Sequence, residues 1–158
     1  IKVMHTTEFL IEQGFDMNLK AEEETTVTYH DPCRLGRQMG VYEEPRELIE
    51  SVEGVSIVEM EHSGEDAMCC GVSSMMSCNE NARALRVARM EEIKSTGADT
   101  MLTACPKCVT HFECLKFEGD ERYADIKILD VVSFLAQQIN EKKENIGQTS
   151  VPVIETEA

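Results

Sequence analysis

The chain has 158 residues, of which 42% are hydrophobic, and a formal net charge of −15. This length is sufficient for one domain with a buried core, and no apolar run is long enough to cross a bilayer. The negative charge argues against nucleic acid as a partner, because few cations are available to displace the counterions of phosphate groups.

The chain begins with Ile1 rather than methionine, and its first residues contain no apolar signal-peptide region. We therefore expect a fragment, a processed chain or a numbering that starts late. Six of the seven arginines lie in the middle of the chain: Arg34, Arg37, Arg46, Arg83, Arg86 and Arg89. We expect these arginines to pair with nearby glutamates on solvated helix faces, with an anionic ligand as the alternative partner.

The first predicted element is a helix over residues 5–13, capped by Thr6 or Thr7 and ended by Gly14. An acidic linker, Glu22–Glu24, leads into a strand over residues 25–29, which is rich in β-branched side chains. Pro45 then fits the first turn of a short helix that ends near Val52, because proline has no amide hydrogen to lose there.

Gly54 leads into a second predicted strand over residues 55–60, and a polar loop follows over 61–71. The longest predicted helix covers residues 80–96. Asn79 or Asn81 caps its start, and Gly97 provides its end. In this helix we expect the apolar face to include the following residues: Ala82, Leu85, Ala88 or Arg89, and Ile93.

A third, short strand is predicted over residues 99–103, followed by a helix that ends near Lys116. A fourth strand is predicted over 126–129, and Asp130 caps an amphipathic helix from Val131 to about Lys142. The chain therefore divides into three predicted parts: an N-terminal helix and acidic linker over 1–24, a cysteine-rich domain over 25–143, and a flexible acidic tail over 144–158.

The alternation of helices and strands predicts an α/β fold with a mostly parallel, four-stranded sheet flanked by helices. Five of the seven cysteines form three groups along this pattern: Cys33, the pair Cys69 and Cys70, and the Cys-x-x-Cys pair Cys105 and Cys108. Each group follows a predicted strand, so we expect all of them at the carboxyl ends of the strands, where open α/β sheets bind ligands.

Soft sulfur ligands select iron–sulfur clusters, zinc or copper(I) over hard cations. The adjacent cysteines favour a cluster, because their side chains diverge and reach different metal ions, and Gly71 would let the backbone approach such a cluster closely. A structural zinc ion is an alternative that needs only four thiolates. A thioredoxin-like redox pair or a disulfide framework is the remaining alternative, although seven cysteines leave one thiol unpaired.

Three sequence blocks, Tyr29–Cys33, Cys69–Gly71 and Cys105–Cys108, resemble the cysteine-rich CCG domain found in the B-type and D-type subunits of heterodisulfide reductases, with the D type the more similar. The domain also occurs in iron–sulfur subunits of glycolate and lactate oxidases, in thiol:fumarate reductases and in the sulfite-reduction-associated membrane complex. The resemblance covers about residues 25–140.

This resemblance implies a noncubane [4Fe-4S] cluster whose five ligands carry the catalysis through the cluster: Cys33, Cys69, Cys70, Cys105 and Cys108. It also implies reduction of a disulfide such as CoM-S-S-CoB, as in methanogenesis. The electrons would come from a second CCG domain or from a ferredoxin-like or flavin subunit. A membrane cytochrome is a further candidate partner.

Two alternatives remain beside the reductase. One is an electron-relay iron–sulfur subunit of a hydroxyacid oxidase or related membrane-associated complex, and the other is a zinc-stabilised interaction domain. This sequence contains neither a second CCG domain nor a ferredoxin-like cysteine run, so we expect a fragment or a subunit that works beside another domain. Reduced thiols and an oxygen-sensitive cluster favour the cytoplasm, including the cytoplasmic face of a membrane through a partner.

Several further residues are candidates for roles near the cluster. Arg34, Arg37 and Arg83 are the predicted contacts for a small anionic disulfide. His30 and His111 flank the ligand blocks and are candidate proton donors, or simply hydrogen-bond partners of the loops.

The remaining cysteines, Cys78 and Cys114, are predicted to be small buried hydrophobic side chains. The methionines near the cysteine pair are predicted to cover the cluster or to fill the core: Met68, Met75 and Met76.

Overall fold

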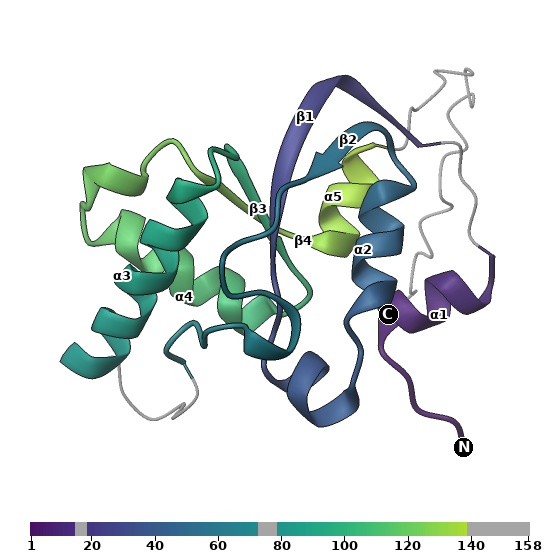
Figure 1. Ribbon diagram of the computed structural model, residues 1–158, viewed down its shortest axis with the longest axis horizontal. Coiled ribbons are helices and arrows are strands. Elements are labelled where there is room, and N and C mark those ends of the chain that lie inside the picture. Colours follow the sequence, from purple (N-terminus) through teal and green to yellow (C-terminus); the bar gives the residue numbers. More distant parts are fainter. Residues whose placement is uncertain (15–18, 73–78, 139–158) are drawn as a thin grey trace, which may run out of the picture.

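The structure is a computed structural model that describes residues 1–14, 19–72 and 79–138. Within these residues, four parallel strands form one sheet in the order β2-β1-β3-β4 (Figure 1). The strands are β1 (Lys20–His30), β2 (Glu53–Ile57), β3 (Thr100–Thr103) and β4 (Lys127–Asp130). The predicted four-stranded parallel sheet is therefore confirmed.

Helices cover both faces of the sheet: α2 (Glu43–Glu50) and α5 (Val131–Gln137) lie on one side, and α3 (Glu80–Ser95) and α4 (Pro106–Phe117) on the other (Figure 1). A fifth helix, α1 (Thr6–Glu12), packs against α2. Short helical turns cover Arg34–Gln38, Gly64–Asp66 and Glu121–Tyr123. No helix in the described part of the chain is both long and apolar enough to span a bilayer.

Each face of the sheet has its own hydrophobic core, because successive side chains of a strand point to opposite faces. On the face of α2 and α5, the core includes Val27, Tyr29, Leu102, Ile49 and Phe134. On the face of α3 and α4, it includes Met101, Ile128, Met90, Ile93 and Phe112. The neighbours Met101 and Leu102 in β3 thus belong to different cores, and both are completely buried.

The helix starts follow local hydrogen bonds that the sequence partly predicts. Asn79 caps α3 by accepting from the Ala82 amide, and Asp130 caps α5 by accepting from the Val132 amide, as predicted. The cap of α1 is different: His5 occupies this position, and its ring accepts from the Thr7 amide. The Glu8 carboxylate also accepts from the His5 amide, so His5 and Glu8 form a capping box instead of the predicted threonine cap.

The largest difference from the predicted elements is the start of β1. The strand begins at Lys20, so the predicted linker residues Glu22–Glu24 are part of it. Lys20 and residues 25–27 of β1 pair with β2, and the register shifts between Lys20 and Thr25, where these glutamates lie. Backbone pairing on the sheet outweighs the low strand preference of glutamate. The predicted acidic tail over 144–158 lies outside the described residues.

A buried cation fixes the segment that follows β1. The Arg46 guanidinium donates to both carboxylate oxygens of Asp31, at 2.8 and 3.0 Å, and to both oxygens of Glu59, at 2.6 and 3.0 Å. It also lies over the Tyr29 ring, 5.0 Å from the ring centroid. The side chains of Arg46 and Asp31 are only 14% and 3% exposed, so removing one partner leaves a buried charge without compensation.

We therefore expect Arg46→Met to lower the free energy of unfolding, by on the order of 3 kcal/mol. Arg122→Met is the matched control, because Arg122 also bonds two carboxylates and lies over a tyrosine ring, but its side chain is 51% exposed. Urea unfolding of the anaerobically prepared chain measures both changes. If both variants lost the same free energy of unfolding, burial of the Arg46–Asp31 pair would add nothing to its contribution to stability.

Candidate metal centre

Four of the five candidate ligands line one cavity at the carboxyl edge of the sheet. The cavity has a volume of about 220 Å³ and is lined by Cys33, Cys70, Cys105 and Cys108 together with Pro32, Arg34, Val72 and Lys107. The fifth candidate, Cys69, lies within hydrogen-bonding reach of the Cys33 thiol. The structure therefore brings all five predicted sulfurs together, from three separate segments of the chain.

Cys33 and Cys105 reach the cavity because β1 and β3 end at the same level. His30 and Thr103, the last residues of these strands, are register partners. Cys33 follows β1 directly, and a tight turn continues from it, in which the Gly36 amide donates to the Pro32 carbonyl at 2.9 Å. Cys105 occupies the position before the first residue of α4 in an extended conformation, and Cys108 lies in the first turn of this helix.

The loop after β2 carries Cys69 and Cys70 to the same place, and it is attached to the rest of the molecule at several points. The Asp31 carboxylate accepts from the Gly64 amide at 2.8 Å. The Arg37 guanidinium donates to the Ala67 carbonyl at 2.6 Å, and the Arg89 guanidinium donates to the His62 carbonyl at 2.7 Å. These bonds fix the approach of the cysteine pair to the cavity.

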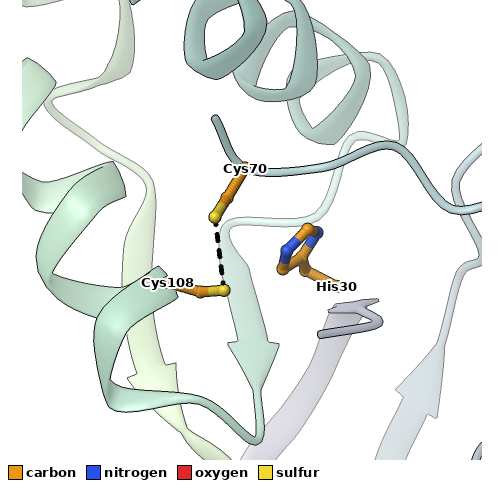
Figure 2. Close-up of side chains that lie close together, drawn as sticks. All are labelled: His30, Cys70 and Cys108. Atoms are coloured by element: carbon orange, nitrogen blue, oxygen red, sulfur yellow. Dashed lines mark hydrogen bonds between the residues drawn. The ribbon is translucent and has the colours of Figure 1, made fainter. Parts of the chain in front are cut away.

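The sulfurs of Cys70 and Cys108 lie 3.4 Å apart, and the His30 ring is beside them (Figure 2). The ligand atoms of His30, Cys70 and Cys108 all lie within 4.8 Å of one another. The Cys108 thiol donates to Cys70, and this bond lowers the pKa of Cys70. Hydrogen bonding with Cys105 and Cys70 and burial raise the pKa of Cys108. A hydrogen bond from Cys108 also lowers the pKa of Cys105 to about 6, with help from the backbone amides of Cys108 and Lys107.

Cys33 shows the opposite effect. Burial raises its pKa, and the nearby sulfurs of Cys69, Cys70 and Cys105 raise it further, because several thiolates so close together repel one another. A bound metal cation removes this repulsion, and thiolates are the form that binds metal. Converging sulfurs around a cavity of about 220 Å³ suit a multinuclear centre. A single zinc ion needs only four thiolates and leaves one sulfur unused.

All six described cysteines are free thiols, so the disulfide framework considered from the sequence is not formed among these residues. Cys114 is only half-buried in α4, not fully buried as predicted. Met68 is half-buried next to the cysteine pair. The predicted roles of Cys78, Met75 and Met76 fall on residues outside the described part of the chain.

The three predicted substrate arginines have different surroundings. Arg34 lines the cavity, Arg37 is bonded to the Ala67 carbonyl, and Arg83 pairs with Glu118 at 3.0 Å and Asp120 at 3.6 Å. Lys107 is a second cation of the cavity wall that was not predicted from the sequence. The sequence contained a signal for this position of Lys107: it lies between the two cysteines of the Cys-x-x-Cys pair, and a residue between two ligands lies close to the centre.

The predicted faces of the longest helix need correction. Leu85, predicted on the apolar face, is 46% exposed, whereas Arg86 and Arg89 are completely buried. Pairing with glutamates is confirmed for both of these arginines: Arg89 and Glu92 form a buried pair at 2.6 Å, and Arg86 reaches the exposed Glu118 at 2.6 Å. Ala82, Arg86, Arg89 and Ile93 follow one another at helical spacing, and this spacing was the signal for their burial.

The two predicted histidines are both buried. His30 is 1% exposed; its Nδ1 accepts from Arg89 Nε at 3.1 Å, and its ring packs edge-on against Phe112 with 5.0 Å between centroids. Burial lowers the pKa of His30. His111 lies under α3, where its carbonyl accepts from Arg86 at 3.2 Å, and burial lowers its pKa as well. His111 belongs to a neighbouring cavity with Cys114, so His30 is the histidine next to the candidate ligands.

Gly71 allows a close approach between two segments of the chain, in addition to the predicted approach to a cluster. Its φ is +93°, and a Cβ atom there would lie 2.4 Å from the Ala82 carbonyl oxygen. Glycine is therefore required because the cysteine-pair segment crosses the backbone of α3 at close range. This crossing holds Cys70 against the cavity.

A comparison with protein families matches residues 27–113 to the cysteine-rich domain named CCG. The chain belongs to this family. The CCG match contains all five cysteines of the candidate centre, and it ends within α4.

Curated relatives place the CCG domain in larger redox proteins. The D-type subunit of the dihydromethanophenazine:CoB–CoM heterodisulfide reductase of Methanosarcina acetivorans is 38% identical over 87% of this chain, which spans 34% of that relative. The probable iron-sulfur-binding oxidoreductase FadF of Bacillus subtilis is 35% identical over 87% of this chain and 20% of the relative. The B-type subunit of the fumarate reductase (CoM/CoB) of Methanothermobacter marburgensis is 34% identical over 85% of this chain and 27% of the relative. The chain thus spans about a third or less of the length of these relatives.

We expect Gly71→Ala to destabilise the CCG domain more than Gly97→Ala does. Both glycines have positive φ, which costs an alanine about 1 kcal/mol, but a Cβ at Gly97 meets nothing within 4 Å. At Gly71 the clash with α3 adds a further cost of about 1–3 kcal/mol. Urea unfolding under anaerobic conditions compares the two variants, and a loss in Gly71→Ala no larger than in Gly97→Ala would contradict the proposed crossing.

Proposed function

We propose that this chain is the iron–sulfur redox domain of a heterodisulfide reductase-like enzyme. In this proposal one noncubane [4Fe-4S] cluster is bound by Cys33, Cys69, Cys70, Cys105 and Cys108. The observation that carries the proposal is the convergence of these cysteines: four of them line one cavity, and Cys69 lies beside Cys33. The domain supplies part of a complete active site, because it spans about a third of its heterodisulfide reductase relatives.

The donor set supports iron and sulfide over zinc. Iron–sulfur clusters are held by cysteine thiolates, and two of these thiols, Cys70 and Cys105, have lowered pKa values before any metal binds. The adjacent cysteines point to different places, since Cys70 faces Cys108 while Cys69 is close to Cys33. A multinuclear centre can bind the sulfurs of both Cys69 and Cys70, whereas a single tetrahedral ion needs only four ligands in all.

A cluster held by these cysteines would supply single-electron transfer to a sulfur atom of the substrate. Cleavage of a disulfide into two thiols consumes two electrons and two protons, so a partner must deliver the electrons. The side chains that line the cavity would bind and orient the disulfide. Pro32 and Val72 provide apolar wall, while Arg34 and Lys107 provide positive charge in an otherwise acidic chain. This lining suits a disulfide with anionic arms, such as CoM-S-S-CoB.

The electron donor is proposed to be a second CCG domain, or a ferredoxin-like or flavin subunit. A membrane cytochrome would connect the complex to the cytoplasmic face of a membrane. The names of the relatives support a multi-subunit assembly, because several of them are subunits of reductases. A curated relative from Chromohalobacter salexigens is a probable membrane-anchored ferredoxin, which is 36% identical over 66% of this chain.

The relatives also favour a second candidate, an electron-relay subunit that binds a cluster but no disulfide. FadF is a probable iron-sulfur-binding oxidoreductase whose name mentions no disulfide. A disulfide that binds at the cluster changes its paramagnetic signal, whereas a relay cluster gives the same signal with and without the disulfide. Electron paramagnetic resonance of the cluster with and without the disulfide therefore separates the two candidates.

We expect the anaerobically prepared chain to contain about four iron and about four sulfide ions and no stoichiometric zinc. Cys70→Ser and Cys105→Ser each remove a ligand and should lose most of the iron and the visible absorbance. Cys114→Ser is the control, because Cys114 lies outside the cluster cavity and should keep the full iron content. One zinc per chain, or an iron content that Cys70→Ser leaves unchanged, would contradict the proposal.

We further expect Arg34→Gln and Lys107→Gln each to weaken the binding of an anionic disulfide about fivefold, which corresponds to about 1 kcal/mol for a partly exposed charge. Arg83→Gln is the matched control, because Arg83 pairs with Glu118 and does not line the cavity. Titration of the cluster signal with CoM-S-S-CoB measures the three affinities. An equal effect of all three variants would indicate a general charge effect rather than contact in the cavity.

A further inference from the structure

We propose that Arg89 holds His30 as a fixed hydrogen-bond donor to the sulfur of Cys70, and that this bond raises the reduction potential of the cluster. The inference rests on the proposed iron–sulfur function. It assigns Arg89 as a positioning residue that acts through His30.

The contacts of Arg89 define the direction of the first hydrogen bond. The guanidinium is completely buried, and its Nε lies 3.1 Å from Nδ1 of His30. A guanidinium carries donors only and stays protonated in proteins. Nδ1 of His30 must therefore accept, and the hydrogen of the neutral ring must be on Nε2.

The second hydrogen bond follows from where the His30 ring lies. The ring is beside the sulfurs of Cys70 and Cys108, with the three ligand atoms within 4.8 Å of one another (Figure 2). Since Nδ1 is occupied by Arg89, Nε2 is the ring nitrogen left to donate, and we assign the Cys70 sulfur beside it as the acceptor.

The support behind Arg89 keeps this arrangement in place. Arg89 Nη1 donates to Glu92 at 2.6 Å and to the His62 carbonyl at 2.7 Å. Glu92 in turn accepts from the His62 amide at 2.5 Å and contacts the His62 ring at 2.9 Å. Phe112 packs edge-on against the His30 ring and limits its rotation. Burial alone would raise the pKa of Glu92, but the hydrogen bonds from His62 and Arg89 outweigh this effect and lower the pKa. Glu92 and Arg89 therefore remain an ion pair.

This geometry favours a hydrogen-bonding role for His30 over the proton-donor role considered from the sequence. A ring whose Nδ1 accepts from a cation cannot take a second proton there without losing that bond. The remaining N–H faces a ligand sulfur. Reduction adds negative charge to a cluster and its sulfurs, and a nearby N–H donor stabilises the reduced state more than the oxidised state. The reduction potential therefore rises.

Redox titrations of the cluster-loaded chain, followed by electron paramagnetic resonance, test the inference with four variants. His30→Leu removes the donor and should shift the potential to a lower value. His30→Gln is the matched control, because its amide can still donate near the former Nε2 position and should keep the potential close to that of the unmodified chain. Arg89→Lys preserves the charge but loses the fixed Nε–H donor, so it should also lower the potential.

The double variant His30→Leu/Arg89→Lys separates positioning from a direct charge effect. If Arg89 acts through His30, the double variant shifts the potential no further than His30→Leu alone. Additive shifts would overturn the positioning role.

Pulsed electron paramagnetic resonance with ¹⁵N-labelled histidine needs no variant. The chain contains four histidines, and we expect one to show nitrogen coupling to the cluster, with the coupling lost in His30→Leu. Absence of this coupling, or an unchanged potential in His30→Leu with full iron content, overturns the inference and leaves the cluster in place. A chain that binds no iron overturns the inference together with the proposed function.

Discussion

The candidate centre depends on one constraint, the parallel direction of the strands. Because His30, Thr103 and Asp130 are aligned at the ends of β1, β3 and β4, the segments that follow these strands leave the sheet at one edge. Cys33 follows β1 and Cys105 follows β3 within a few residues, so their convergence is a consequence of the register. An antiparallel arrangement would send such segments to opposite ends of the sheet.

The helix α3 contributes more than cover for the sheet. Its buried arginines reach across the interior to residues far away in the sequence: Arg89 contacts His30, and Arg86 contacts His111 and Glu118. Buried charges are costly unless each has a partner, and here Glu92 and Glu118 provide carboxylates. Buried ion pairs thus lie on both faces of the sheet, because Arg46 and Asp31 form one beside Tyr29 in the core of α2 and α5.

The sequence predicted the fold well where local signals and periodicity agree. The β-branched run before Cys33, the caps Asn79 and Asp130, and the alternation of helices and strands all gave correct elements. The start of β1 was missed because its glutamates are poor strand formers, and the strand is set by Lys20 and Thr25, which pair with β2 on either side of them. The burial of Arg86 was missed because its partners, His111 and Glu118, come from outside α3, whereas Arg89 was one of two candidates for the apolar face. Strand ends determine the positions of Cys33 and Cys105, but Cys69 and Cys70 reach the site through a long loop held by hydrogen bonds from other segments. Lys107 was recognised only from the lining of the cavity.

The central claim is that five sulfurs surround one multinuclear iron centre. X-ray absorption at the iron edge of the anaerobically prepared chain tests it most directly, because scattering distinguishes sulfur neighbours from metal neighbours. We predict a sulfur shell together with a short iron–iron shell, and the loss of both in Cys70→Ser. A sulfur shell without metal neighbours, or a zinc edge with four sulfurs and no iron signal, would contradict this claim.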